Sequence, residues 1–243
     1  MDSRGRLYVV ATPIGNLKDM TFRALEVLER VDFIAAEDTR EARKILSHFR
    51  LSAGSRILSY FRDNEQARVP GLIALLERGH DLALIVTRGT PGISDPAYLI
   101  VREAAARGIP VVPVPGASAL TAALSVCGVP ADRFLFAGFL PLRPGKRRKA
   151  LEWLEKGAET AVIYESPHRL LKTLREIETA MGGEREITVC RELTKIFEEI
   201  RTGTVSGMID EFSRRDVRGE FVLVLSRPGR NNLPGAKGRE TEP

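Results

Sequence analysis

The sequence predicts an α/β protein of two domains, and two observations support this prediction. Short apolar runs, rich in branched side chains, recur along the chain, and stretches with helical periodicity lie between them. Continuous apolar runs of this kind are typical of strands buried on both faces of a parallel or mixed sheet. Strands that alternate with amphipathic helices form a sheet covered by helices on both sides.

Nine of the apolar runs are predicted as strands. They are Leu7–Ala11, Phe33–Ala36, Ile57–Tyr60, Leu82–Val86, Val111–Val114, Phe134–Gly138, Ala161–Tyr164, Ile187–Cys190 and Phe221–Leu225. Apolar residues at helical spacing mark two of the segments between them. These two sets are Ala42, Ile45, Leu46 and Phe49, and Leu170, Leu171, Leu174 and Ile177. Each set covers one face of a helix, which predicts helices that pack on the sheet.

The domain boundary is predicted near the segment Val114–Ser118. Five strands precede this segment and four follow it, so each half has enough strands for a sheet of its own. We therefore expect an N-terminal α/β domain over residues 1–116 and a C-terminal α/β domain over residues 117–226. Residues 227–243 contain almost no apolar side chain to bury, which predicts a disordered tail.

Composition and charge restrict the class of protein. The chain has 243 residues, of which 43% are hydrophobic and 28% are charged, as in an ordinary globular protein. No signal-like N-terminus or membrane-spanning run is present, which predicts a cytoplasmic protein without a membrane partner. A net charge of +5 mildly favours a polyanionic partner. The two cysteines, Cys127 and Cys190, are too few and too far apart for a disulfide framework or a zinc site.

The segments that follow the first three predicted strands carry polar groups. Thr12–Asp19 lacks the glycine pattern of a dinucleotide or P-loop site, and it ends in the hydrogen-bonding residues Asn16 and Asp19. Glu37–Arg40 and Asp63–Glu65 follow the next two strands. Helix capping is the alternative in each case, and it explains Asn64 and Glu65 less well than Asp63. These segments favour a polar cleft wall at the ends of the strands.

Two later segments combine small residues with turn residues. Thr87–Pro96 contains two glycines and two prolines, which predicts an irregular loop in which Gly89 lets a ligand approach the backbone. Pro115–Ala119 opens a helix with small residues, and a plain helix start is the alternative. Both segments therefore favour ligand binding at the ends of the fourth and fifth strands.

Charged groups gather in the second half of the chain. Arg191–Lys195, with Glu198 and Glu199, forms either a solvated face or a loop with acid–base and phosphate-binding groups. Five cations, at Arg143 and over 146–149, form either a phosphate-binding patch in the loop after Pro141 or a solvated helix start. No spacing of Asp, Glu or His matches a metal site, so none is predicted.

Seven of these segments together resemble the ribosomal RNA small subunit methyltransferase I family, a branch of the tetrapyrrole-methylase superfamily. The resemblance extends from Leu7 to about Leu225. The segments are 11–19 (ATPIGNLKD), 36–40 (AEDTR), 89–96 (GTPGISDP), 114–119 (VPGASA), 138–141 (GFLP), 165–169 (ESPHR) and 191–195 (RELTK). Seven motifs in this order are far more specific than any one of them.

The resemblance implies two α/β domains of the tetrapyrrole-methylase type with a cleft between them for the cofactor S-adenosyl-L-methionine. It also implies a homodimer that methylates the 2′-hydroxyl of a cytidine ribose in 16S ribosomal RNA, either naked or in the assembled small subunit. By position, the residues that bind the cofactor are Pro13, Ile14, Thr87, Gly89, Thr90, Ile93, Ser118, Ala119, Tyr164 and Leu193.

Further roles follow from the same resemblance and from the chemistry of the side chains. Glu165, Glu192 and Lys195 are expected near the reacting hydroxyl, where Lys195 favours the developing alkoxide. The residues expected on the RNA side are Asn16, Asp19, Arg40, Asn64, Glu65, Arg147, Arg148 and Lys149.

Three positions depart from the family pattern. Thr87-Arg88 replaces the usual Asp-Ala, so an expected carboxylate is missing beside the cofactor. Ala97 replaces a glycine and Asp63 replaces a histidine. Two other functions stay open. One is a methyltransferase for a porphyrin-like small molecule, and the other, motivated by the missing carboxylate at Thr87, is a ribosome-binding factor with impaired catalysis.

Overall fold

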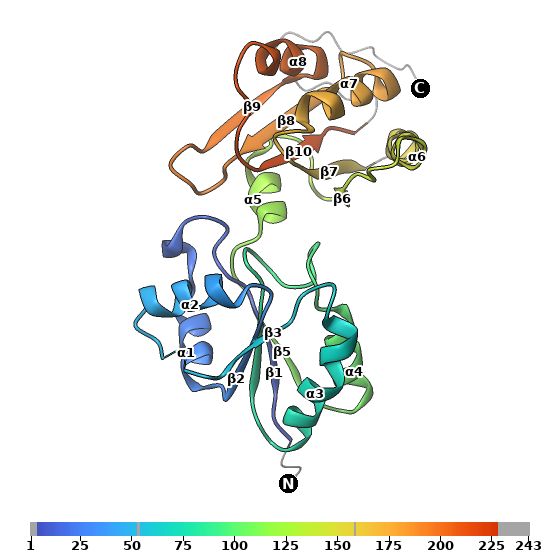
Figure 1. The fold of residues 1–243 in the computed structure, drawn as a ribbon. Helices are drawn as coiled ribbons and strands as arrows, with labels where there is room; N and C mark the ends of the chain where they lie inside the picture. Colours follow the sequence, from blue (N-terminus) through green and yellow to red (C-terminus); the bar gives the residue numbers. More distant parts are fainter. Residues whose placement is uncertain (1–3, 53, 158, 228–243) are drawn as a thin grey trace. The chain divides into compact units, whose positions relative to one another are not determined.

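The computed structural model describes residues 4–52, 54–157 and 159–227, and the chain divides into two compact units, Met1–Ser118 and Ala119–Pro243 (Figure 1). The sequence placed this boundary two residues earlier, after Gly116. Arg227 is the one residue of the predicted tail that the structure describes, and its guanidinium contacts the carboxylate of Asp132. The remainder of that prediction, over 228–243, lies outside the described residues.

The first unit contains a parallel sheet of five strands in the order β3-β2-β4-β1-β5. The strands are β1 (Leu7–Val10), β2 (Phe33–Ala36), β3 (Ile57–Ser59), β4 (Leu82–Ile85) and β5 (Val111–Val114). Leu7 pairs with Leu82 on one side and with Val111 on the other. Strands β1, β2 and β4 are almost wholly buried, which is why their sequences are continuously apolar. Because the strands are parallel, all their carboxyl ends lie along one edge of the sheet.

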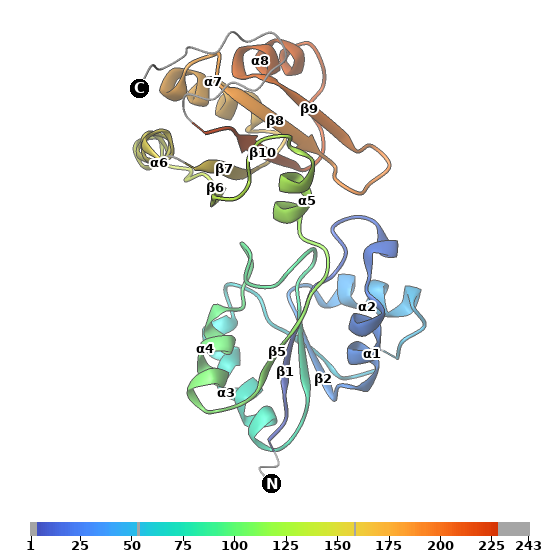
Figure 2. The same cartoon turned by 180° about the vertical axis from the view of Figure 1, so that it is seen from behind.

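Helices cover both faces of this sheet (Figure 2). Helices α1 (Phe22–Arg30) and α2 (Thr39–His48) pack on one face, together with their own hydrophobic cluster. Helices α3 (Glu65–Glu77) and α4 (Tyr98–Ala106) pack on the other face. A short 3-10 turn, η1 (Leu17–Asp19), lies between β1 and α1. In open parallel sheets covered on both faces, ligands generally bind beyond the carboxyl ends of the strands.

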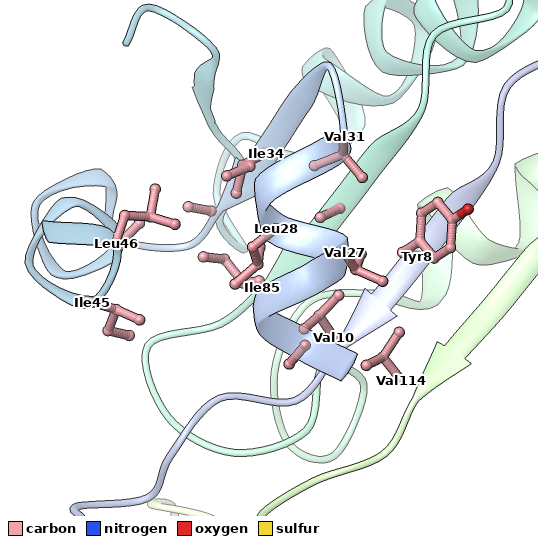
Figure 3. Packing of buried hydrophobic residues seen from close by; sticks show 14 of the residues in the cluster. Tyr8, Val10, Val27, Leu28, Val31, Ile34, Ile45, Leu46, Ile85 and Val114 are labelled. Carbon is pink, nitrogen blue, oxygen red and sulfur yellow. The ribbon is translucent and has the colours of Figure 1, made fainter. Parts of the chain in front are cut away.

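Helix α1 shows why these helices form where they do. Thr21 begins the helix, because its side-chain oxygen accepts a hydrogen bond from the N–H of Ala24. Ala24, Val27 and Leu28 share one face and are buried against the sheet (Figure 3). Full burial of a side chain such as Leu28 contributes ~1.5–3 kcal/mol. The cap and the buried face together fix the loop between β1 and α1 at the carboxyl edge.

The second unit contains a mixed sheet of five strands in the order β6-β7-β10-β8-β9. Its elements are α5 (Ala119–Val126), β6 (Phe134–Phe139), α6 (Pro144–Lys156), β7 (Thr160–Glu165), α7 (Leu170–Met181), β8 (Glu186–Arg191), β9 (Glu199–Thr204), α8 (Val205–Ser213) and β10 (Phe221–Leu225). Strands β6 and β7 are parallel, and the other pairs are antiparallel.

No helix among the described residues is both long and apolar enough to cross a membrane.

Strand β9 is the element that the sequence did not predict. Its residues Glu199–Thr204 are mostly polar or charged, and none is buried, because the strand forms the edge of the sheet. It pairs along its full length with the buried strand β8. The sequence interpretation placed Glu199 in a charged segment that was either a solvated helix face or a loop. In the structure, Glu199 begins this strand and pairs with Arg201 and Arg215.

Candidate functional site

The loops after β1 and β4 are joined at the carboxyl edge of the first sheet. Thr12 and Gly89 exchange two backbone hydrogen bonds, of 2.9 and 3.0 Å, as an antiparallel bridge. The buried hydroxyl of Thr12 also donates to the carbonyl of Val86 at 3.0 Å. Pro13 and Ile14, which the sequence predicted at the cofactor, follow directly and are buried. The bridge therefore holds two predicted cofactor segments side by side.

A third loop joins this pair. The hydroxyl of Thr90 donates to the carbonyl of Ala117 at 3.1 Å, which ties the loop after β4 to the segment that ends in Ser118. Gly89 has a φ of +84°, and a Cβ at this residue would lie 3.4 Å from Cγ2 of Ile14 and 3.8 Å from the carbonyl oxygen of Ala117. The positive φ therefore disfavours a side chain, whereas the two distances are ordinary van der Waals contacts.

The loop after β4 is conformationally strained. Gly89, Gly92 and Ser94 all have positive φ, and the +75° of Ser94 is uncommon for a residue with a side chain. Ile93, another predicted cofactor contact, donates its N–H to the carbonyl of Thr90 at 3.2 Å. Residues with a strained backbone are often found in ligand-binding loops, where contacts with the surrounding structure hold them in that conformation.

A carboxylate stands beside Thr87, although the sequence suggested that one was missing there. The N–H and the hydroxyl of Thr87 both donate to Oε2 of Glu37, at 3.0 and 2.8 Å. Burial and the negative charge of Glu37 raise the pKa of Asp95 from 3.8 to about 6, against the opposing charge of Arg62. Glu37, which the sequence interpretation placed only in a polar cleft wall, and Asp95, in the predicted irregular loop, thus add two carboxyl groups that were not assigned to the cofactor from the sequence.

Asp19 has the clearest unfulfilled hydrogen-bonding capacity at this edge. Its Oδ2 is buried and has no hydrogen-bond partner among the residues that the structure describes. A buried acceptor without a partner is uncommon and calls for a donor from a ligand or from solvent. Asn16, by contrast, caps η1, because its Oδ1 accepts from the N–H of Lys18 at 3.1 Å.

Three more residues predicted on the RNA side have local partners. The exposed guanidinium of Arg40 pairs with Asp38 at 3.2 Å. Oδ1 of Asn64 accepts from the N–H of Phe61 at 2.8 Å, which shapes the turn before α3. Oε2 of Glu65 accepts a longer hydrogen bond, of 3.4 Å, from the hydroxyl of Tyr60. The Arg40 side chain is 84% exposed beside Asp38, whereas the hydrogen bonds of Asn64 and Glu65 stabilise the loop before α3.

In the second unit, Glu165 is buried inside an ion-pair network, contrary to its expected place at a reacting hydroxyl. Its side chain has no exposed surface. Oε2 accepts from Arg147 at 3.3 Å and from the hydroxyl of Thr173, and Oε1 accepts from the N–H of Ser166 at 2.8 Å. Arg169 adds an ion pair at 3.4 Å. A carboxylate with these partners is saturated and inaccessible, so its role is structural.

Arg147 is also misplaced by the sequence interpretation, which grouped it with exposed cations. Its side chain is only 3% exposed, and it contacts Glu165, Glu176 and Thr173. Arg148 and Lys149 are exposed on the same helix, α6. The basic run is therefore the first part of a helix with Pro144 at its start, and it is not a loop. Arg147 holds this helix, and its neighbours present their charges to solvent.

Glu192 and Lys195 lie together in the loop after β8. Nζ of Lys195 contacts Oε1 of Glu192 at 2.7 Å and Oε2 of Glu220 at 2.8 Å. Burial acts to raise the pKa of Glu192, but hydrogen bonds from Lys195 and from the N–H of Glu220 hold it below its ordinary value. Glu192 and Thr194 both have positive φ, so this loop is strained as well. The pair therefore offers an ionised carboxylate and an ammonium group that are hydrogen-bonded to each other.

The remaining predicted cofactor residues lie near this loop or at the division between the units. Leu193 is buried between the two strained residues of the loop. Tyr164, at the end of β7, has its ring edge-on to Phe136 and Phe139, with centroids 4.9 and 5.7 Å away. Ser118 ends the first unit and Ala119 begins α5. Their contacts to a cofactor stay predictions.

Sequence comparison relates most of the chain to known proteins. The sequence model of the family "Tetrapyrrole (Corrin/Porphyrin) Methylases" matches residues 6–208. A ribosomal RNA small subunit methyltransferase I from Synechocystis sp. is 46% identical over 222 residues, which cover 91% of this chain and 79% of the relative. Proteins of the same name from Mesorhizobium japonicum and Thermotoga maritima are 48% and 44% identical over 90% and 91% of this chain, and over 74% and 98% of their own lengths.

Structure comparison gives the same fold at lower identity. The methyltransferase CobJ superposes with a TM-score of 0.68 at 18% identity, over 95% of this chain and 97% of that one. The uroporphyrin-III-C-methyltransferase from Thermus thermophilus superposes with a TM-score of 0.62 at 21% identity, over 92% and 94% of the two chains. At these identities the likeness concerns the fold alone.

Proposed function

The chain belongs to the ribosomal RNA small subunit methyltransferase I family of the tetrapyrrole methylases, and on this premise we propose that it methylates the 2′-hydroxyl of a cytidine ribose in small-subunit ribosomal RNA with S-adenosylmethionine as methyl donor. The observation that carries the proposal is 42–48% identity to enzymes of that name over at least 90% of this chain.

The two other functions are disfavoured. A porphyrin-like substrate would predict closer similarity to enzymes such as the uroporphyrin-III-C-methyltransferase, which is only 21% identical. Impaired catalysis was inferred from the carboxylate missing at Thr87. Glu37 brings a carboxylate to that place, so the departure at Thr87 no longer indicates a defective site.

The residues at the carboxyl edge of the first sheet suit the cofactor. Gly89 has no side chain to cover its backbone between Ile14 and Ala117. Asp19 offers a buried acceptor without a hydrogen-bond partner among the described residues. A sulfonium nucleoside brings hydroxyl, amino and ammonium donors that such acceptors bind. We assign its binding to Pro13, Ile14, Thr87, Gly89, Thr90, Ile93, Ser118, Ala119, Tyr164 and Leu193, with Glu37 and Asp19 as additional acceptors.

Positioning is the larger part of the proposed mechanism. S-adenosylmethionine, when bound, supplies a methyl group on a positively charged sulfur. Holding the ribose hydroxyl in line with such a group is worth ~7–11 kcal/mol, whereas a general base adds about 10²–10⁴-fold. Rigid loops such as the bridged and strained one after β4 serve the first purpose. Catalysis in this proposal therefore depends mainly on loop geometry.

Glu192 and Lys195 are the groups that we assign to the hydroxyl. Glu192 is ionised at neutral pH, because its pKa is lowered, and it accepts a hydrogen bond from the hydroxyl. A carboxylate of low pKa is a weak base, so it orients the hydroxyl more than it removes the proton. The ammonium of Lys195 favours the negative charge that develops on the oxygen. Glu165 has no part in this step, because its oxygens are saturated and buried.

The RNA partner fits the charge on α6. Arg148 and Lys149 are exposed, and the helix that carries them is anchored by the buried Arg147. We assign Arg148 and Lys149 to phosphate contacts, with Arg40 and the polar groups Asn16, Asn64 and Glu65 on the RNA side of the first unit. Asp19, which the sequence interpretation placed on the RNA side, is assigned to the cofactor instead. The enzyme would act in the cytoplasm, as a homodimer, on ribosomal RNA or on the assembled small subunit.

Methyl transfer to isolated small subunits tests the proposal. Cofactor labelled in its methyl group is incubated with the protein and with small subunits that lack the modification, with naked RNA and a porphyrin-like tetrapyrrole in parallel. The proposal predicts label in the RNA and none in the tetrapyrrole. Label in the tetrapyrrole alone would establish the small-molecule function. Bound cofactor without transfer to any acceptor would favour the factor with impaired catalysis.

A further inference from the structure

An exposed aromatic ring stands at the start of α4, directly after the strained loop. Tyr98 is the first residue of this helix and is 67% exposed. One turn later, Arg102 places its guanidinium carbon 5.2 Å from the centroid of the ring and donates Nη1 to the hydroxyl at 3.4 Å. The cation therefore covers one face of the ring, and the exposure of the residue leaves the other face open.

The surroundings of this ring are positively charged. Nη2 of Arg62 donates to the carbonyl of Ser94 at 2.9 Å, which fixes a second guanidinium on the loop that leads into α4. The first turn of α4 contains no acidic residue. Asp95, the nearest acid along the chain, interacts electrostatically with Glu37 and Arg62. One arginine thus covers the ring, and a second is held on the loop four residues before it, at the same edge of the sheet as the candidate site.

These surroundings favour RNA over other occupants. A protein partner would be expected to cover a contiguous apolar patch, whereas the groups around Tyr98 are guanidiniums. A second copy of this chain carries a net charge of +5 and would bring further positive charge to the same place. Single-stranded RNA supplies flat bases for the open face of the ring and phosphates for the arginines.

We propose that Tyr98 forms a stacking subsite for an unpaired base of the RNA substrate, with Arg62 at a neighbouring phosphate. The inference rests on the proposed function and refines it, because it names a base contact in the first unit that is separate from the basic helix α6. Each stacked base on an aromatic side chain contributes to affinity for any sequence, because every base has a flat π face.

Binding of a short, dye-labelled single-stranded RNA to the full chain tests the subsite. The variants are Tyr98→Ala, Tyr98→Phe and, as a matched control, Phe22→Ala. Phe22 is also an exposed aromatic residue at the first position of a helix, with 87% exposure, but α1 lies on the opposite face of the sheet. A ribose-phosphate strand of the same length without bases serves as the second probe.

The expected result is specific to the base. Tyr98→Ala raises Kd for the RNA about 5- to 150-fold, the change that corresponds to ~1–3 kcal/mol for one stacked base. Tyr98→Phe retains binding within about threefold, because the ring remains, and Phe22→Ala has no effect. The strand without bases binds the wild-type protein and Tyr98→Ala equally, and the salt dependence of binding is unchanged by the loss of a ring.

Several outcomes would overturn the inference. Equal binding of RNA by the wild-type protein and Tyr98→Ala excludes the subsite, and so does an equal loss on the strand without bases. A changed oligomeric state of Tyr98→Ala in sedimentation, with unchanged RNA affinity, would identify the ring as a contact between copies. Failure of the proposed function gives a different pattern, in which Tyr98→Ala weakens RNA binding but the wild-type protein transfers no methyl group.

Discussion

Arg147→Met should destabilise the second unit strongly, although the sequence places Arg147 in a run of cations that are otherwise exposed. Its side chain is 3% exposed and neutralises Glu165, which has no exposed surface at all. Removal of one partner from a buried ion pair leaves an uncompensated charge and costs ~3–5 kcal/mol. Arg169, at 3.4 Å from Glu165, and the N–H of Ser166 remain and soften this loss. We therefore expect a decrease in the free energy of unfolding of about 3 kcal/mol.

The neighbouring residue provides the control. Arg148 is on the same helix, but its side chain is 77% exposed and its ion pair with Glu152 is 3.4 Å long. Arg148→Met should therefore change the free energy of unfolding by less than about 0.5 kcal/mol. A Glu165→Gln change in the Arg147→Met background removes the stranded charge and should recover part of the loss.

Urea unfolding measured by tryptophan fluorescence suits this comparison. Trp153 is the only tryptophan of the chain and lies on α6, so its signal reports the second unit without interference from the first. The reasoning would be refuted if Arg147→Met and Arg148→Met were equally stable. It would also be refuted if Glu165→Gln gave no recovery in the double variant. Either result would make Glu165 available again as a group near the substrate.

Three further predictions concern the sites themselves. Gly89→Ala should weaken cofactor binding at least about tenfold in calorimetry, because the new Cβ strains the loop beside Ile14, whereas Gly54→Ala, also at positive φ but with open space around it, should bind normally. Replacement of Arg148 and Lys149 by Ala should reduce the slope of log K against log salt for RNA binding by about 0.7–0.9 for each lost phosphate contact and leave cofactor affinity unchanged. Because the folded-state pKa of Asp95 is raised from 3.8 to about 6, the folded state binds more protons than the unfolded state between these values. The contribution of Asp95 to stability should therefore fall as pH rises from about 4 to 6. Chemical denaturation followed by circular dichroism should show that the free energy of unfolding of the wild-type protein decreases over this range relative to that of Asp95→Asn.

The sequence predicts most of the fold because burial leaves a clear pattern. Phe33–Ala36 and Phe221–Leu225 are strands with the predicted bounds, since a strand covered on both faces must be apolar throughout. Val111–Val114 also has the predicted bounds, although it is an edge strand and only partly buried. Strand β9 escapes this pattern, because an edge strand that is half exposed tolerates charges at most positions. Pairing with β8, and not its own composition, makes it a strand.

The site is less predictable because its contacts join segments that are distant in the sequence. Glu37 meets Thr87 only because β2 and β4 are neighbours in the sheet, which the order of strands along the chain does not reveal. Arg147 could have been recognised. It lies four residues before Leu151 and seven before Leu154, on the buried face of α6, so helical periodicity separates it from its exposed neighbours.

The position of the transferred methyl group tests the central claim most directly. Small subunits that lack the modification are treated with the protein and methyl-labelled cofactor, and the RNA is digested to nucleosides that are identified by mass spectrometry. The account predicts that the label is recovered in cytidine, on the oxygen of the ribose. Label on a base, or on a nucleoside other than cytidine, would contradict it.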